Sequence, residues 1–263
     1  MKLETKAVEK VWGRRDLPAP FNTPGAEPVG EIWFEPPPEL SQVLVKYLFT
    51  SEKLSVQVHP SDAQAPAGSR GKEECWLVLD AEPGATLAIG FKQAVDVHTM
   101  RSGAQDGSIE EMLEWHPVKA GDFFYLPAGT VHAIGPGLTL VEVQQNSDIT
   151  YRLYDYGRPR ELHLDDGLAV AKGELYPARC YREVPKDTST LLVDGPFFRF
   201  SQISGMPGDA ALAPHSGPVM VLPLEGEVTI DGETVAAGAC GLADSADRVD
   251  FTSAQRTLIV SGV

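Results

Sequence analysis

Cysteine is scarce in this chain of 263 residues, which has only Cys75, Cys180 and Cys240. The three are far apart, odd in number and without C-x-x-C spacing. The sequence therefore indicates neither a disulfide framework nor a thiolate zinc site. Cys75 is expected to be a buried core thiol, because it alternates with Glu74 on a predicted strand and so points to the opposite face.

Long apolar runs and excess positive charge are also missing. No run of about 18 apolar residues occurs that could span a bilayer, and residues 1–6 lack the apolar segment of a signal peptide. The formal net charge is −15. Nucleic acids and anionic membranes demand a basic face on their partners, so neither is expected to bind here. We expect a cytoplasmic protein that holds any anionic substrate with local Lys or Arg side chains.

Turn-forming residues, by contrast, are abundant, with 25 Gly and 21 Pro. Between them lie short alternating or continuous apolar runs, which predict an all-β dominated chain. The predicted strands are residues 42–48, 54–58, 75–79, 86–89, 122–126 and 139–144. A capping-box pattern, with Ser108 at the N-cap and Glu111 three residues on, predicts a short helix over 108–115 within a cover segment of about 92–118.

The polar, Pro-containing run 183–190 has the composition of a linker. Beyond it, runs at 219–223 and 226–230, the turn Asp231-Gly232 and residues 233–235 predict a hairpin. This second β unit has no clustered metal ligands. We expect two units, at 1–183 and 184–263.

Four donors in the first unit have the spacing of a metal site. Gln57 and His59 are two residues apart on a predicted strand and so face the same side, while Glu74 and His132 can reach the same point from neighbouring strands. Two imidazoles, a carboxylate and a neutral carbonyl, without thiolate, suit Zn²⁺, Mn²⁺, Fe²⁺ or Ni²⁺ and leave positions open for water or a substrate oxygen. Structural or surface roles are expected for the other histidines, His98, His116, His163 and His215.

Charged residues near these donors are candidates for chemistry. Lys72 lies two residues before Glu74 and so shares its strand face, where it could act as a base or an electrophile. The segment 146–158 adds Asp148, Arg152 and Arg158, and the two arginines could grip an anion or stabilise developing negative charge.

The pattern Gly-x5-Pro-x-Gly-x2-His from Gly121 to His132 resembles the second motif of the cupin superfamily. This resemblance implies a bicupin of two β-barrel or jelly-roll units, with a short helical insertion in the first and a degenerate, metal-free second unit. Further motifs are similar to class I mannose-6-phosphate isomerases of the short bacterial type. They are residues 54–60, 71–76, 127–134 and 146–148 with Arg152, supported by 11–13 and 30–33.

That resemblance implies one zinc ion held by Gln57, His59, Glu74 and His132, and an essential Arg152. It also implies that Lys46, Ser55 and Arg158 bind a sugar phosphate. The implied reaction interconverts mannose 6-phosphate and fructose 6-phosphate by moving a proton between C2 and C1 through an enediol. Lys72, Asp148 and a metal-bound hydroxide are all possible bases, and we favour Lys72 with Asp148 assisting.

Two other functions use the same donors. A cupin dioxygenase would bind Fe²⁺ through two histidines and a carboxylate, but it would not explain Lys72 or the paired arginines. A non-catalytic sugar-binding cupin would explain the degenerate second unit and would show no turnover. The sequence leaves open the oligomeric state, the breadth of sugar substrates and any role of the second unit beyond packing.

Overall fold

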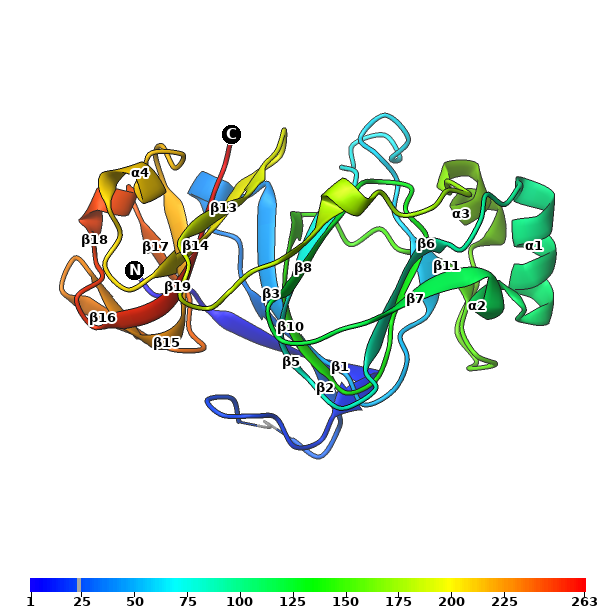
Figure 1. Ribbon diagram of the computed structural model, residues 1–263, viewed down its shortest axis with the longest axis horizontal. Coiled ribbons are helices and arrows are strands. Elements are labelled where there is room, and N and C mark those ends of the chain that lie inside the picture. Colours follow the sequence, from blue (N-terminus) through cyan, green and yellow to red (C-terminus); the bar gives the residue numbers. More distant parts are fainter. Residues whose placement is uncertain (23–24) are drawn as a thin grey trace.

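The structure is a computed structural model, and it describes residues 1–22 and 25–263. Its strands form three antiparallel sheets, with a small group of helices at one end of the molecule and the C-terminal part of the chain at the other (Figure 1). Within the described residues, no helix is long and apolar enough to cross a membrane.

The first sheet has seven strands in the order β1-β2-β3-β10-β5-β8-β12. Their bounds are Thr5–Arg14, Val29–Phe34, Val43–Phe49, Leu138–Gln145, Glu74–Ala81, Asp122–Leu126 and Tyr181–Glu183. The second sheet has five strands in the order β11-β4-β9-β6-β7. Their bounds are Tyr151–Tyr154, Val56–Val58, His132–Ile134, Thr86–Phe91 and Leu113–Pro117.

The strands predicted at 42–48, 54–58, 75–79, 86–89, 122–126 and 139–144 are thus confirmed as β3, β4, β5, β6, β8 and β10. The prediction of a β-rich chain is confirmed as well. The barrel expectation needs correction, because the strand orders of the described residues are open paths and no sheet closes on itself.

Both faces of the seven-stranded sheet are covered, which explains why every residue of β3 is buried. Val45, Tyr47 and Phe49 belong to a core shared with Phe200 and Leu258 of the third sheet. The alternating residues of the same strands face the five-stranded sheet instead, because successive strand side chains point to opposite faces. Cys75 lies in the shared core, as predicted, and all three cysteines are free thiols.

The third sheet is formed by residues 190–261, with path β13-β14-β19-β15-β16 and with β17 and β18 also paired to β15. The bounds, in chain order from β13 to β19, are Thr190–Asp194, Arg199–Ser204, Val219–Ile230, Glu233–Ala236, Gly241–Ala243, Val249–Asp250 and Ala254–Ser261. The hairpin predicted around Asp231-Gly232 is confirmed between β15 and β16, and both turn residues have positive φ, 48° and 84°.

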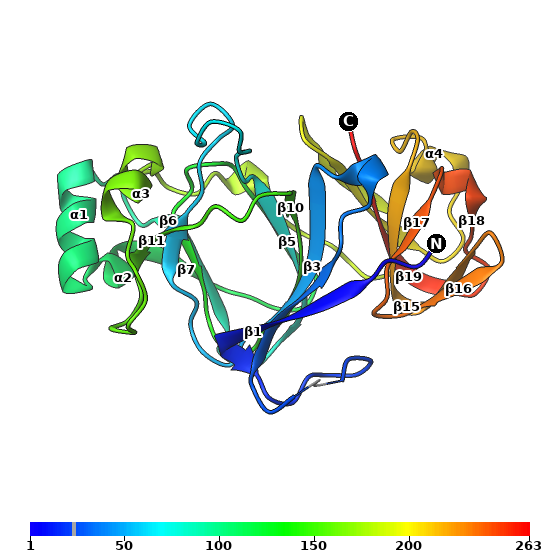
Figure 2. The ribbon, with the colours of Figure 1, turned by 180° about the vertical axis from the view of Figure 1, so that it is seen from behind.

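The first residues of the chain join this third sheet. The backbone N–H of Leu3 donates to the carbonyl of Cys240, and Lys2 forms a β-bridge with Gly241. Figure 2 shows β1 running from this contact along the edge of the seven-stranded sheet, where it pairs with β2. The start of the chain therefore links the third sheet to the first.

Helices α1 (Val97–Asp106), α2 (Ile109–Met112) and α3 (Leu164–Val170) lie beside the five-stranded sheet (Figure 1). Their buried side chains share a core with Val56, Ala133 and Leu153 of that sheet. The remaining helical turns are α4 (Asp209–Leu212), η1 (Pro38–Leu40), η2 (Ala178–Cys180) and η3 (Ala246–Arg248).

The helix predicted over 108–115 is only partly correct. The segment forms the single turn α2 and then the strand β7, which pairs with β6. Ser108 makes no capping hydrogen bond, because its hydroxyl donates to Asp106. The longer helix α1 was not predicted individually, and it is capped by Asp96, whose carboxylate accepts from the backbone N–H of Thr99.

Candidate metal centre and active site

Three predicted metal ligands converge between the first two sheets. His59 follows β4, Glu74 begins β5 and His132 begins β9, and their donor atoms lie within 4.8 Å of one another. The Glu74 carboxylate is 3.5 Å from His59 Nε2 and 3.4 Å from His132 Nε2. All three side chains are almost fully buried, with exposed fractions of 1–3%.

The two imidazoles are oriented so that each can bind a metal ion through Nε2. His59 Nδ1 is 2.8 Å from the carbonyl of Ile149, and His132 Nδ1 is 2.9 Å from that of Thr130. A carbonyl can only accept, so each Nδ1 carries the proton and each Nε2 presents its lone pair to the centre. Burial lowers the pKa of both imidazoles, and the Lys72 ammonium lowers both further. Both rings are thus neutral, as metal binding requires.

Glu74 has the properties of a metal-binding carboxylate. Burial alone would raise its pKa, but neighbouring Lys72 and His132 hold that pKa below its ordinary value, so the group is ionised. Its Oε2 is paired with the Lys72 ammonium at 2.9 Å, whereas Oε1 has no hydrogen-bond partner among the described residues. A buried, ionised carboxylate with one unpartnered oxygen, facing two imidazole lone pairs, fits a divalent metal cation.

Gln57, the fourth predicted ligand, lies directly opposite His132 in the β4–β9 pairing. Its amide nitrogen is 3.2 Å from His132 Nε2, and its oxygen accepts a hydrogen bond from the Ser55 hydroxyl at 3.2 Å. A half-turn of the amide would present the oxygen to the centre instead, and the two orientations differ only in which atom is nitrogen.

Tight turns fix the loops that carry these ligands. Gly129 has φ 85°, a conformation that favours glycine, and a Cβ there would lie 2.8 Å from the carbonyl of Val170. Its backbone N–H donates to the carbonyl of His59 at 2.9 Å. The turn that leads into His132 is therefore tied directly to the other histidine.

A row of alternating charges leads away from the centre. Lys72 Nζ lies 2.9 Å from Glu74 Oε2, 3.0 Å from His59 Nε2 and 3.8 Å from Glu142 Oε1. Glu142 is in turn 2.9 Å from Lys46, its direct cross-strand partner on β3. Glu142 also accepts from the indole of Trp76, its partner on β5. All of these charged side chains are buried.

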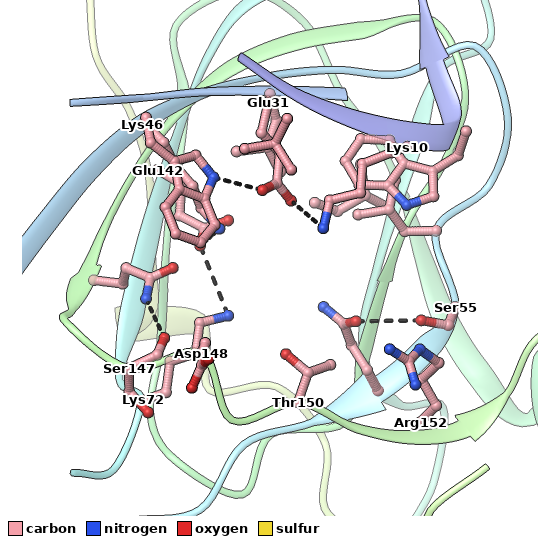
Figure 3. Close-up of a pocket in the computed structure, with 18 of the residues that line it drawn as sticks. Lys10, Glu31, Lys46, Ser55, Lys72, Glu142, Ser147, Asp148, Thr150 and Arg152 are labelled. Atoms are coloured by element: carbon pink, nitrogen blue, oxygen red, sulfur yellow. Dashed lines mark hydrogen bonds and ion pairs between the residues drawn. The ribbon is translucent and has the colours of Figure 1, made fainter. Parts of the chain in front are cut away.

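A cavity of about 550 Å³, a volume typical of small-molecule sites, reaches the neighbourhood of the centre through Gln57 and Lys72, which line it. Figure 3 shows Lys10, Lys46, Ser55, Lys72, Asp148 and Arg152 pointing into it. The six Lys or Arg residues that line it are Lys6, Lys10, Lys46, Lys72, Arg152 and Arg160, and the four acids are Glu31, Glu142, Asp148 and Glu161. The lining thus carries an excess of two positive charges in a chain of net charge −15, which favours an anionic ligand.

Arg152 reaches this cavity from β11, where it pairs with Gln57 of β4. Gln57 in turn pairs with His132, so the three side chains form one row across the five-stranded sheet. The Arg152 guanidinium donates to the carbonyl of Glu161 at 3.1 Å, and the backbone N–H of Arg152 donates to Nδ1 of His163. The loop after β11 thereby holds the arginine in place.

Arg158, predicted as a substrate-binding residue, does not line the cavity. It pairs with the buried Asp155 at 2.8 Å, donates to the carbonyl of Lys53 and lies over the ring of Tyr156. Asp155 also binds Arg160 through two contacts of 2.6 Å, and Arg160 does line the cavity. The two arginines thus share one carboxylate, and of the two only Arg160 lines the cavity.

The other predicted residues lie in or beneath the cavity, and Asp148 is exposed at its rim. Sequence reasoning missed Glu142, which joins Lys46 to Lys72, and Lys10 and Glu31 on the first two strands. A signal for Glu142 was present, since a charged residue alternates with Val141 and Val143 on a predicted strand.

No family model matches the chain. It is 40% identical over 208 residues to a mannose-6-phosphate isomerase from Streptococcus mutans and 37% identical over 206 residues to one from Bacillus subtilis. These alignments cover 74% and 73% of this chain and 65% of the length of each relative.

Solved structures share the fold. The crystal structure of the Bacillus subtilis mannose 6-phosphate isomerase superposes with a TM-score of 0.79 and 25% identity, covering 100% of this chain and 99% of that one. A variant of the Salmonella typhimurium phosphomannose isomerase gives a TM-score of 0.71 at 15% identity, covering 99% and 98%. The chain is therefore similar in sequence to these mannose-6-phosphate isomerases over about two thirds of their length, and it shares the cupin fold of the Bacillus subtilis enzyme.

Proposed function

We propose that the protein interconverts mannose 6-phosphate and fructose 6-phosphate by moving a proton between C2 and C1 through an enediol. The observation that carries this proposal is the His59–Glu74–His132 cluster, which Gln57 and Lys72 connect to a cavity whose lining has excess positive charge. The names of the similar proteins from Streptococcus mutans and Bacillus subtilis support the same substrate.

The proposed cofactor is one Zn²⁺ ion, held by Gln57, His59, Glu74 and His132. Neutral imidazoles, an ionised carboxylate and an amide, without thiolate, form a ligand set suited to zinc. When bound, the metal supplies a Lewis acid that stabilises negative charge on the substrate oxygens at C1 and C2.

The residues around the cavity have complementary roles in this proposal. Arg152 lies beside Gln57 in the sheet and can stabilise the negative charge that develops in the enediol. Lys72 lies within 3.0 Å of two metal ligands and also lines the cavity, so it can reach a proton at C1 or C2. Asp148 at the rim assists the proton transfer.

The test is turnover of mannose 6-phosphate by metal-loaded protein, repeated after chelation, after zinc add-back and with Arg152→Ala. Activity that chelation removes, zinc restores and Arg152→Ala reduces about 100-fold or more is the expected result. Arg101→Ala is a matched control, because Arg101 is exposed on α1 and pairs with Asp165 away from the cavity. A folded, metal-replete protein without isomerisation would refute the proposal and favour a dioxygenase or a sugar-binding cupin.

A further inference from the structure

The positive groups of the cavity differ in how well the protein itself neutralises them. Lys46 has the Glu142 carboxylate at 2.9 Å, and Lys72 has the Glu74 carboxylate at 2.9 Å. Both ammonium groups are therefore engaged in close ion pairs within the protein. An incoming anion would have to compete with a buried carboxylate for either lysine.

Lys10 of β1 lacks such a close pair. Its nearest carboxylate, Glu31, is 3.8 Å away, beyond hydrogen-bond distance, and Glu31 already accepts a bond from the indole of Trp33 at 2.6 Å. In Figure 3 the Lys10 amine points into the cavity, across from Ser55 and Arg152. This lysine therefore offers its hydrogen-bond donors to a ligand.

Local electrostatics also favour an anion beside Lys10. Burial lowers the pKa of the Lys10 amine and Glu31 raises it, while the positive charges of Lys46 and Arg160 lower it further. Burial and the charge of Arg160 likewise lower the pKa of Arg152. The positive charge of Arg160 thus acts on both Lys10 and Arg152, and an anion bound between these groups would relieve the repulsion.

The backbone explains why Lys10 is presented in this way. Val8, Lys10 and Trp12 alternate along β1 and all line the cavity, whereas Glu9 and Val11 between them are exposed. The backbone N–H of Lys10 donates to the carbonyl of Pro28 at 3.0 Å. The lysine is thus held on a paired strand rather than on a mobile loop.

We infer that Lys10 binds the phosphate group of the substrate, and that Arg160, whose Nε and Nη2 are paired with Asp155, adds its positive charge from the loop after β11. The inference rests on the proposed function for the identity of that substrate. It places the phosphate at the β1 side of the cavity, across from Lys72 and Asp148, so that the sugar carbons extend toward the metal ligands. Arg160 takes the part that the sequence motif suggested for Arg158, and Asp155 positions it.

The test compares Lys10→Met, Lys10→Arg and, as a matched control, Lys6→Met. Lys6 is on the same strand and lines the same cavity, but it is exposed and lies over the Trp33 ring. Loss of one charged hydrogen bond to phosphate should raise the KM for mannose 6-phosphate about 10- to 100-fold in Lys10→Met, with kcat changed less than about threefold. Lys10→Arg, which keeps the charge, should recover most of this loss.

Two results would overturn the inference. One is a KM in Lys10→Met no different from that in Lys6→Met. The other is an equal loss of turnover by Lys10→Met on mannose 6-phosphate and on unphosphorylated mannose, because a phosphate-binding residue should affect only the former. The thermal midpoint of each variant shows that it is folded.

A binding measurement separates this inference from the proposed isomerase activity. Calorimetric titration with inorganic phosphate needs no turnover, and the wild-type protein should bind it about tenfold or more tightly than Lys10→Met does. Equal binding by the two proteins would overturn the role of Lys10 even in an active isomerase. Lys10-dependent phosphate binding by a protein that does not isomerise would support the site while refuting the proposed reaction.

Discussion

Substitution of Glu142 by Gln tests the buried charge network most directly. Glu142 is 3% exposed, and its carboxylate is 2.9 Å from Lys46 and 3.8 Å from Lys72. Glutamine keeps the shape and can still accept the bond from Trp76, but it removes the negative charge. Lys46, only 6% exposed, would then be a buried cation without its close partner. Breaking a buried pair in this way costs about 3 kcal/mol or more of unfolding free energy.

This loss should lower the thermal midpoint by about 6–12 °C in a protein of this size. Urea unfolding in the presence of a chelator measures it without a contribution from metal binding. Glu183→Gln is the matched control, because Glu183 forms an exposed pair with Lys119 at 3.0 Å and should cost less than about 1 kcal/mol. Lys46→Met added to Glu142→Gln should recover part of the stability. A Glu142→Gln protein as stable as Glu183→Gln would refute the reasoning.

Three further predictions concern metal, a turn and pH. Chelation should lower the thermal midpoint, and zinc should restore it in proportion to the logarithm of the zinc concentration, because the metal ligands converge only in the folded state. A midpoint that chelation leaves unchanged would contradict the proposed metal site. Gly129→Ala should weaken zinc binding measured by competition, since its Cβ would meet the Val170 carbonyl, whereas Gly84→Ala, with φ 86° and open space around it, should not. Burial lowers the pKa of His215 from 6.5 to about 4, so as the pH falls the unfolded state binds a proton at this residue before the folded state does. The free energy of unfolding should therefore decrease by up to about 3 kcal/mol between pH 6.5 and pH 4. His215→Gln should lose this part of the acid sensitivity and exposed His98→Gln should keep it; equal acid unfolding curves for the two variants would show the reasoning to be wrong.

The sequence predicted most of the β-framework because core strands have a strong local signal. Apolar residues must alternate or run continuously where one or both faces of a sheet are covered. The convergence of Gln57, His59 and Glu74 was predictable for a related reason, since the two-residue spacing on a strand and the pairing of neighbouring strands bring such side chains to one face.

The errors arose where tertiary contacts override local preference. The segment after Ser108 has a helix-start pattern, but pairing with β6 extends residues 113–117 into a strand. Helix α1 contains Gly, Ser and Thr and buries only Met100, Gly103 and Ala104, so its sequence signal is weak. The substrate-binding role predicted for Arg158 stays a prediction; Arg158 and Arg160 share the Asp155 carboxylate, and neither composition nor spacing reveals which of the two lines the cavity.

Strand β1 couples the C-terminal sheet to the cavity. Residues just before its start are hydrogen-bonded to the C-terminal sheet, and its middle presents Lys10 to the cavity. Local unfolding of the C-terminal sheet would break the hydrogen bonds that hold residues 1–3. The start of β1 would then be free to move, and the position of Lys10 would be less well fixed. A sheet far from the metal centre can thus influence ligand binding, because it fixes the end of the strand that carries Lys10.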